Sequence, residues 1–100
     1  IGGPPEGMTR PHAHHILFKK GRGKTQRELV QRGQAILEQY GIDPVFGFES
    51  LGWAPNVQGQ HTTEALRGVV EAIEAVHDRG GSRQEMVEAL RQMGDVAAAR

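Results

Sequence analysis

Three stretches of this chain repeat apolar residues at the spacing of an amphipathic helix, and that pattern limits the folds open to it. In each stretch the apolar residues recur at intervals of three and four, so a helix places them on one face. The three faces are Leu29, Gly33, Ile36, Leu37 and Tyr40 in residues 25–40; Ala65, Leu66, Val69, Val70, Ile73 and Val76 in residues 61–77; and Met86, Leu90 and Met93 in the last helix. A chain of 100 residues forms one domain with a modest core, and we expect these faces to lie in that core.

Local signals mark where two of these helices begin. Thr25 and Glu28 have the spacing of a capping box at the start of the first helix. Ser82 and Glu85 have the same spacing at the start of the last one. The alanine-rich residues 97–100 are weakly specified, so we expect the C-terminal end to fray.

Two short segments are predicted to be extended. Residues 12–18 end in three apolar residues and are predicted to form a strand whose apolar end is partly buried, and a second strand is expected near residues 50–54. We expect Trp53 to plug the core with its indole N–H bonded to a partner, with stacking against a nucleic-acid base as the alternative. Residues 1–11 are rich in glycine and proline, which indicates a flexible linker ahead of a single domain at 12–100.

The zero net charge of the chain conceals an asymmetry. Residues 1–40 hold seven Lys and Arg against three Glu, whereas residues 41–100 hold five against nine Asp and Glu. Four of the cations fall in a glycine-containing loop: Lys19, Lys20, Arg22 and Lys24. Charges and glycine amides of this kind can hold phosphate oxygens, although the spacing is not that of a P-loop and a plain solvated loop is the alternative.

The histidines are the chemically distinctive residues. Three of the five lie within four positions, at His12, His14 and His15. In a strand the first two point to one face and the third to the other. The chain has no cysteine, so a metal would be held by His, Asn, Asp, Glu or water. Two histidines from separate elements can fix an ion while a third acts as general base, which makes His14, His15 and His61 the set of interest, with a surface histidine patch as the alternative.

Several motifs in order give this chain a family resemblance. Ala13-His14-His15 is followed by an apolar end and a helical stretch, then by Glu49-Ser50-Leu51-Gly52-Trp53-Ala54-Pro55-Asn56, then by Gly59-Gln60-His61-Thr62. Over residues 12–76 this order resembles the AHH family of the HNH/endonuclease VII nuclease superfamily. The resemblance implies an α+β fold with a small ββα-metal, HNH-like core, a helical insertion between the strands, and additional C-terminal helices.

The resemblance also implies roles for individual residues. His14 and His61 would bind a divalent metal, and His15 would be the general base. Asn56 would complete the site or orient the base. The adjacent positions of His14 and His15 leave open that these two roles are exchanged.

One departure from the family pattern concerns the residue that braces the base. Many HNH proteins have an asparagine just before or within the second strand, where this chain has Ser50, so Asn56 is the remaining candidate. His12 either joins the metal shell or faces solvent, and with His61 as the second ligand it is assigned a spectator or outer-shell position.

The activity implied by the resemblance is that of a bacterial polymorphic toxin domain. It would be a metal-dependent endonuclease that hydrolyses phosphodiester bonds, DNA more readily than RNA, with Mg²⁺, Mn²⁺, Zn²⁺ or Ni²⁺ as cofactor. Lys19, Lys20, Arg22 and Lys24 would bind the substrate. The producing bacterium would deliver it to the cytoplasm of a target cell and make a cognate immunity protein, with no membrane partner. The alternative is a small helical interaction module with a structural, histidine-bound metal and no catalysis.

Overall fold

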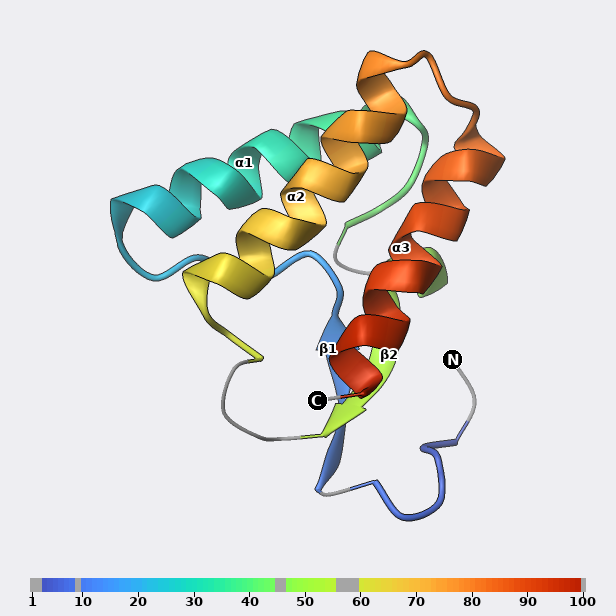
Figure 1. The fold of residues 1–100 in the computed structure, drawn as a ribbon. Helices are drawn as coiled ribbons and strands as arrows, with labels where there is room; N and C mark the ends of the chain where they lie inside the picture. The colour runs from blue at the N-terminus through green and yellow to red at the C-terminus, as the bar shows by residue number, and fades with distance from the viewer. Residues whose placement is uncertain (1–2, 9, 45–46, 56–59, 100) are drawn as a thin grey trace.

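The chain folds as a small α+β protein in which two strands are joined to three helices (Figure 1). A computed structural model describes residues 3–8, 10–44, 47–55 and 60–99. The elements, in order, are β1 (Pro11–His15), α1 (Gly23–Gln39), a short 3-10 helix (Phe48–Ser50), β2 (Leu51–Pro55), α2 (Thr63–Asp78) and α3 (Arg83–Ala98). The two strands are antiparallel, and α1 lies in the connection between them.

The two faces of the β1–β2 ribbon differ in what covers them. In the pairing of the two strands, His12 lies opposite Ala54 and His14 lies opposite Gly52. Residues that lie opposite one another on paired strands point to the same face of the ribbon. That face is the buried one, because Ala54 is fully buried and α3 packs against β2 (Figure 1). The ribbon therefore presents two of the histidines inward, toward the helices.

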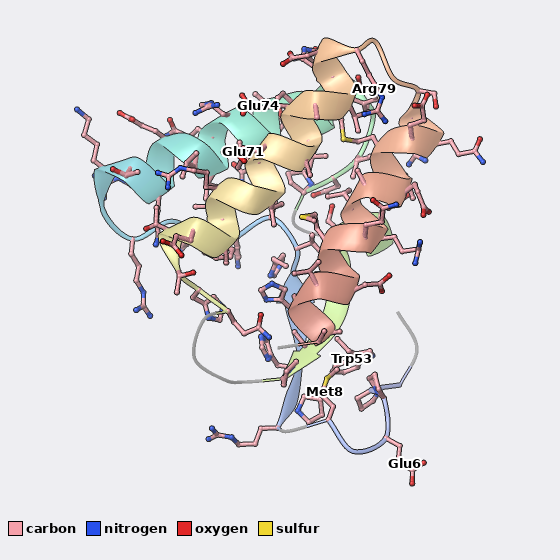
Figure 2. All side chains as sticks on the ribbon, viewed as in Figure 1. Glu6, Met8, Trp53, Glu71, Glu74 and Arg79 are labelled. Atoms are coloured by element: carbon pink, nitrogen blue, oxygen red, sulfur yellow. The ribbon has the colours of Figure 1, made fainter. Side chains whose placement is uncertain are left out.

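Trp53 lies on the other face of the ribbon, so its predicted role as a core plug is wrong. It pairs with the exposed Ala13, is only half-buried, and does not belong to the buried apolar cluster. Figure 2 shows its ring beside the strands, away from α1 and α2. The apolar spacing of a strand does not reveal which face the helices will cover, and here α3 packs against β2 and Ala54 is fully buried.

The three apolar helical faces form the core as predicted. Helices α1 and α2 lie side by side, and α3 packs against α2 (Figure 1). Residues 16–18, which follow β1, are at most 5% exposed, which is deeper than the partial burial expected. Gly33 explains part of that depth, since a Cβ there would lie 2.8 Å from both methyl carbons of Leu17. A glycine in the α1 face thus lets the chain after β1 run directly beneath the helix.

The helix ends confirm one capping prediction, contradict another, and bury part of the C-terminal stretch that was expected to fray. Ser82 and Glu85 form the predicted capping box. Helix α1 begins at Gly23, ahead of Thr25, and its cap residue Arg22 makes no side-chain cap; the predicted Thr25 box is therefore absent. The C-terminal end is also held more firmly than expected, because Ala97 is buried inside α3. None of the helices in the described ranges has the length and apolarity needed to cross a membrane.

Candidate metal centre

Three histidines from two distant parts of the chain converge beside the ribbon. One ring nitrogen from each of His12, His14 and His61 lies within 4.8 Å of the others. The ring centroids are 5.6 Å apart for His12 and His14, 5.7 Å for His14 and His61, and 6.1 Å for His12 and His61. Nitrogen atoms that bind one metal ion at about 2.1 Å lie roughly 3–4 Å from one another. Small side-chain movements would therefore let the three imidazoles bind a single metal ion.

Strand β1 supplies two of the three rings through its two-residue period. His12 and His14 point to the same side of the strand, where His14 is 4% exposed. Both ring nitrogens of His12 are buried, and neither has a hydrogen-bond partner among the described residues. An unsatisfied buried polar atom costs about 1–3 kcal/mol, and coordination of a metal would relieve one of the two.

The third ring comes from the residue just before α2, where two neighbours fix its position. Gln60 is buried, and its side-chain N–H groups donate to the backbone oxygens of Pro55, at the end of β2, and Ala97, near the end of α3, at 3.0 and 2.8 Å. Thr62 caps α2 by accepting a hydrogen bond from the Ala65 amide at 3.1 Å. His61 therefore stands ahead of the helix, whereas the sequence pattern placed it in the first turn.

Two further side chains lie near the cluster, Phe18 after β1 and Gln26 in α1. The ring of Phe18 lies 6.3 Å from that of His14 and 5.5 Å from that of His61, centroid to centroid. Gln26 accepts a hydrogen bond from the Arg22 amide and donates one to the Thr63 hydroxyl, at 2.8 and 3.0 Å. Because Gln26 is buried in α1, this bridge ties the start of α1 to the start of α2, next to the third histidine.

The electrostatic surroundings favour the neutral, metal-binding form of His61. Although the residue is largely exposed, desolvation of its ring is the main cause that lowers its pKa, and the nearby charges of His12 and Arg22 lower this pKa further. A lowered pKa leaves the imidazole unprotonated at pH 7, with a nitrogen lone pair available to a metal.

The other predicted site residues are placed at different positions around this cluster. The three converging histidines line a pocket of about 210 Å³, which we call the histidine pocket. His15 is not one of the three, but it also lines this pocket. The structure therefore brings His14, and not His15, together with His61. It also moves His12 from its expected spectator position into the cluster. Asn56 lies outside the described residues.

Ser50 does not take the place of the missing bracing asparagine. Its hydroxyl donates to the backbone oxygen of Asp43 at 2.8 Å, while its own carbonyl accepts from the Ile16 amide at 2.9 Å. The side chain is fully buried in this role. Ser50 therefore holds the chain immediately after His15 through its backbone, and its hydroxyl is directed to Asp43.

The predicted cationic loop divides into residues that reach the pocket and residues that do not. Lys19 and Lys20 line the same pocket as the histidines. Arg22 is close enough for its charge to act on His61. Lys24 lies farther along, highly exposed in α1, and forms an ion pair with Glu28 at 4.0 Å. The lining of the pocket therefore combines four imidazoles with two lysines.

The donor set indicates which metals fit. Three imidazole nitrogens suit Zn²⁺ and Ni²⁺, whereas Mg²⁺ and Mn²⁺ prefer oxygen ligands. No other His, Asp or Glu among the described residues joins the three, which would leave coordination positions for water or substrate. Of the four ions considered from the sequence, zinc and nickel are the better matches.

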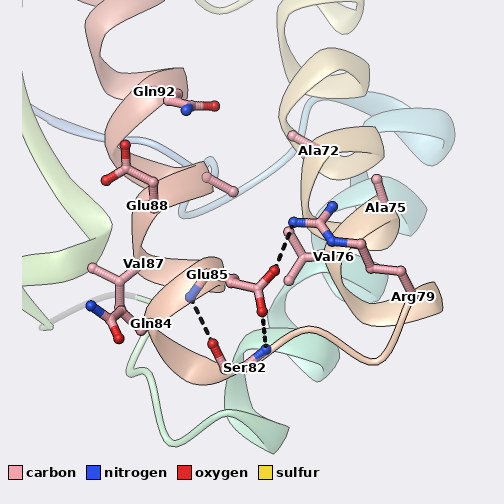
Figure 3. Close-up of a pocket in the computed structure, with 11 residues that line it drawn as sticks. Ala72, Ala75, Val76, Arg79, Ser82, Gln84, Glu85, Val87, Glu88 and Gln92 are labelled. Atoms are coloured by element: carbon pink, nitrogen blue, oxygen red, sulfur yellow. Dashed lines mark hydrogen bonds and ion pairs between the residues drawn. The ribbon is translucent and has the colours of Figure 1, made fainter.

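A larger hollow lies between α2 and α3 but has no comparable chemistry (Figure 3). Its volume is about 940 Å³. Its charged lining residues are already engaged: Arg79 pairs with Glu85, Glu85 completes the capping box with Ser82, and Glu88 pairs with Arg91. Size alone therefore does not identify the functional site in this molecule.

Comparison of the sequence with protein families, with curated proteins and with solved structures found no match. What defines the protein is then its own structure, a small α+β fold with a three-histidine cluster at the junction of β1, α2 and a cationic loop.

Gln60, which the sequence did not single out for a role, is expected to be a positioning residue. Replacing Gln60 with alanine removes the hydrogen bonds that join the segment before α2 to the backbone oxygens of Pro55 and Ala97, and a buried polar group that loses its partner costs about 1–3 kcal/mol. We expect a lower midpoint of thermal unfolding and weaker zinc binding measured by calorimetry. Gln84→Ala, an exposed residue in α3, is the matched control. Unchanged zinc affinity in Gln60→Ala would show that His61 is positioned by other contacts.

Proposed function

We propose that this protein is a metal-dependent nuclease domain with an HNH-like core, in which His12, His14 and His61 hold a divalent metal and His15 is the general base. The observation that carries the proposal is the convergence of three imidazoles from β1 and the start of α2. Strand pairing with α2 following it gives the ββα order that the AHH resemblance implies.

A catalytic role is favoured over a structural one by what lies beside the three rings. A structural zinc site is closed by four protein ligands, whereas a catalytic one keeps a position open. Here three ligands within the described chain adjoin a pocket that a fourth histidine and two lysines line. The interaction module with a structural metal accounts for the three ligands but gives no reason for His15, Lys19 and Lys20 to gather there.

Each group has a defined task in phosphodiester hydrolysis. A metal bound by the three imidazoles would supply Lewis-acid stabilisation of the charge that develops on the phosphate. His15 would take a proton from the attacking water, since a neutral imidazole is well matched to proton transfer near pH 7. Lys19 and Lys20 would neutralise the phosphate oxygens of the bound strand. The nucleophile is water, so no covalent intermediate on the protein is needed.

The partners follow from the same proposal. The substrate is nucleic acid, with DNA favoured over RNA. If the domain is a toxin delivered into a competing cell, as the resemblance implies, the producing cell needs an immunity protein. The region around His15 and the lysines is the surface that such a protein would be expected to mask.

Removal of the metal tests the proposal directly. We expect the protein to cleave plasmid DNA when supplied with Zn²⁺, Ni²⁺, Mn²⁺ or Mg²⁺ and to lose that activity in EDTA, with RNA digested in parallel to compare substrates. Adding back one metal at a time should restore activity and identify the ion. Cleavage that persists undiminished in EDTA, after extensive dialysis against the chelator, would overturn the proposal.

A further inference from the structure

Beside the histidine pocket, another hollow runs along the side of α1. It has a volume of about 280 Å³, and its polar lining consists of Lys19, Lys20, Arg27, Gln31 and Gln34. Lys19 and Lys20 line the histidine pocket as well. The two hollows therefore share a wall, and we call the second one the α1 groove.

The α1 groove has an unusual charge for a protein with no net charge. Its lining contains three cations and no carboxylate. Elsewhere in the described chain, ion pairs neutralise the cations of α3 and of the distal part of α1, as Arg32 with Glu74, Arg83 with Glu49, and Arg91 with Glu88 and Asp95 show. By contrast, Lys19, Lys20 and Arg27 form no ion pair with any described residue.

The helix places the groove residues on one line. Arg27, Gln31 and Gln34 are spaced by four and three in α1, so their side chains share one face of the helix. The side-chain amides of Gln31 and Gln34 offer both donors and acceptors, which suit phosphate and sugar oxygens as well as base edges. In sequence order, the polar lining residues that follow the histidines of β1 are thus two lysines, an arginine and two glutamines.

We propose that the α1 groove holds the nucleic-acid backbone on one side of the phosphate that is cleaved, with Arg27, Gln31 and Gln34 as binding residues. This inference rests on the proposed nuclease function. The helical insertion between the two strands then serves as the substrate-binding arm of the domain, and the shared lysines connect the bound strand to the histidine pocket.

The test measures binding without catalysis. A short fluorescein-labelled DNA duplex is titrated with protein in EDTA, and its anisotropy is followed at several salt concentrations. Each cation that contacts a phosphate adds about one to the slope of log affinity against log salt. Arg27→Gln is expected to weaken binding about two- to five-fold at low salt and to lower the slope by about one. Gln31→Ala with Gln34→Ala should weaken binding with little change in slope.

Arg67→Gln is the matched control for charge. Arg67 is an exposed cation of α2 that lines neither hollow and forms no ion pair with a described residue, so its loss should leave the slope nearly unchanged. Equal effects of Arg27→Gln and Arg67→Gln would overturn the inference, because they would reflect overall charge alone. So would equally effective competition by polyglutamate, which would assign the groove to an acidic protein.

The outcomes also separate this inference from the nuclease function. If the protein cleaves DNA but Arg27→Gln binds and cleaves as the unchanged protein does, the groove is wrong and the nuclease function stands. If Arg27→Gln weakens binding selectively while no metal supports cleavage, the groove stands as a nucleic-acid site and the nuclease function falls.

Discussion

Replacing His12 with alanine is expected to abolish tight binding of Zn²⁺ or Ni²⁺ and, with it, the metal-dependent cleavage of nucleic acid. Removing one of three imidazole ligands leaves two, and no other His, Asp or Glu of the described residues belongs to the converging group. Loss of a ligand should cost more than the roughly 10–100-fold in affinity that is typical of groups behind the ligands. His14→Ala and His61→Ala should have the same effect, which calorimetric titration of the metal-free protein would measure.

Thermal unfolding gives a second, independent test of this prediction. In the metal-free protein, alanine at position 12 removes two buried nitrogens that have no partner in the described chain, so we expect its thermal midpoint to be equal or higher. With zinc present the order should reverse, because a ligand at about 100 times its dissociation constant stabilises the folded state by about 2.7 kcal/mol. The unchanged protein gains this stabilisation by zinc, and the His12→Ala variant does not.

His77 provides the matched control, since it is the fifth histidine and lies at the opposite end of α2 from His61. Its ring contacts Tyr40, at 6.0 Å between centroids. His77→Ala should bind zinc as the unchanged protein does. If His12→Ala, His14→Ala and His61→Ala all bind zinc as tightly as the unchanged protein does, the metal does not bind at this cluster.

The contrast between His12 and Trp53 shows where sequence pattern stops being informative. Helical periodicity identified the core faces of all three helices because a 3.6-residue repeat fixes one side of a helix. A strand of alternating residues fixes two sides but does not state which one the helices will cover. Here α3 packs over β2, which buries the histidine face of β1 and leaves Trp53 half-buried on the other face.

The supports of the site were beyond sequence reasoning for a related reason. Gln60 reaches Ala97 across 37 positions of the chain, and Gln26 reaches Thr63 across the same separation. A glutamine between two elements has no periodic signature, so only the packed fold reveals that it is buried and bonded. The predicted Thr25 capping box was wrong for a comparable reason. At the start of α1 it is the side chain of Gln26 that accepts a hydrogen bond, from the backbone amide of Arg22.

Replacing His15 with alanine is expected to separate catalysis from metal binding. If His15 is the general base, its loss should lower the rate of cleavage by about 10²–10⁴-fold and leave zinc affinity within about two-fold of the unchanged protein. The reason is positional, since His15 lines the pocket but is not one of the three imidazoles that converge. Single-turnover cleavage with saturating metal, together with calorimetry on the same preparation, measures both quantities.

The pattern across the four histidine variants then decides between the roles. Ligand variants should lose metal and activity together, whereas His15→Ala should lose activity alone and stay inactive at any zinc concentration. Lower metal affinity in His15→Ala with unchanged affinity in His14→Ala would exchange the two roles, which the convergence of His14 with His61 argues against. A His15→Ala protein that cleaves at full rate would leave the metal without a histidine base, and the proton would then have to pass to another group of the pocket, where Lys19 and Lys20 are the remaining titratable side chains.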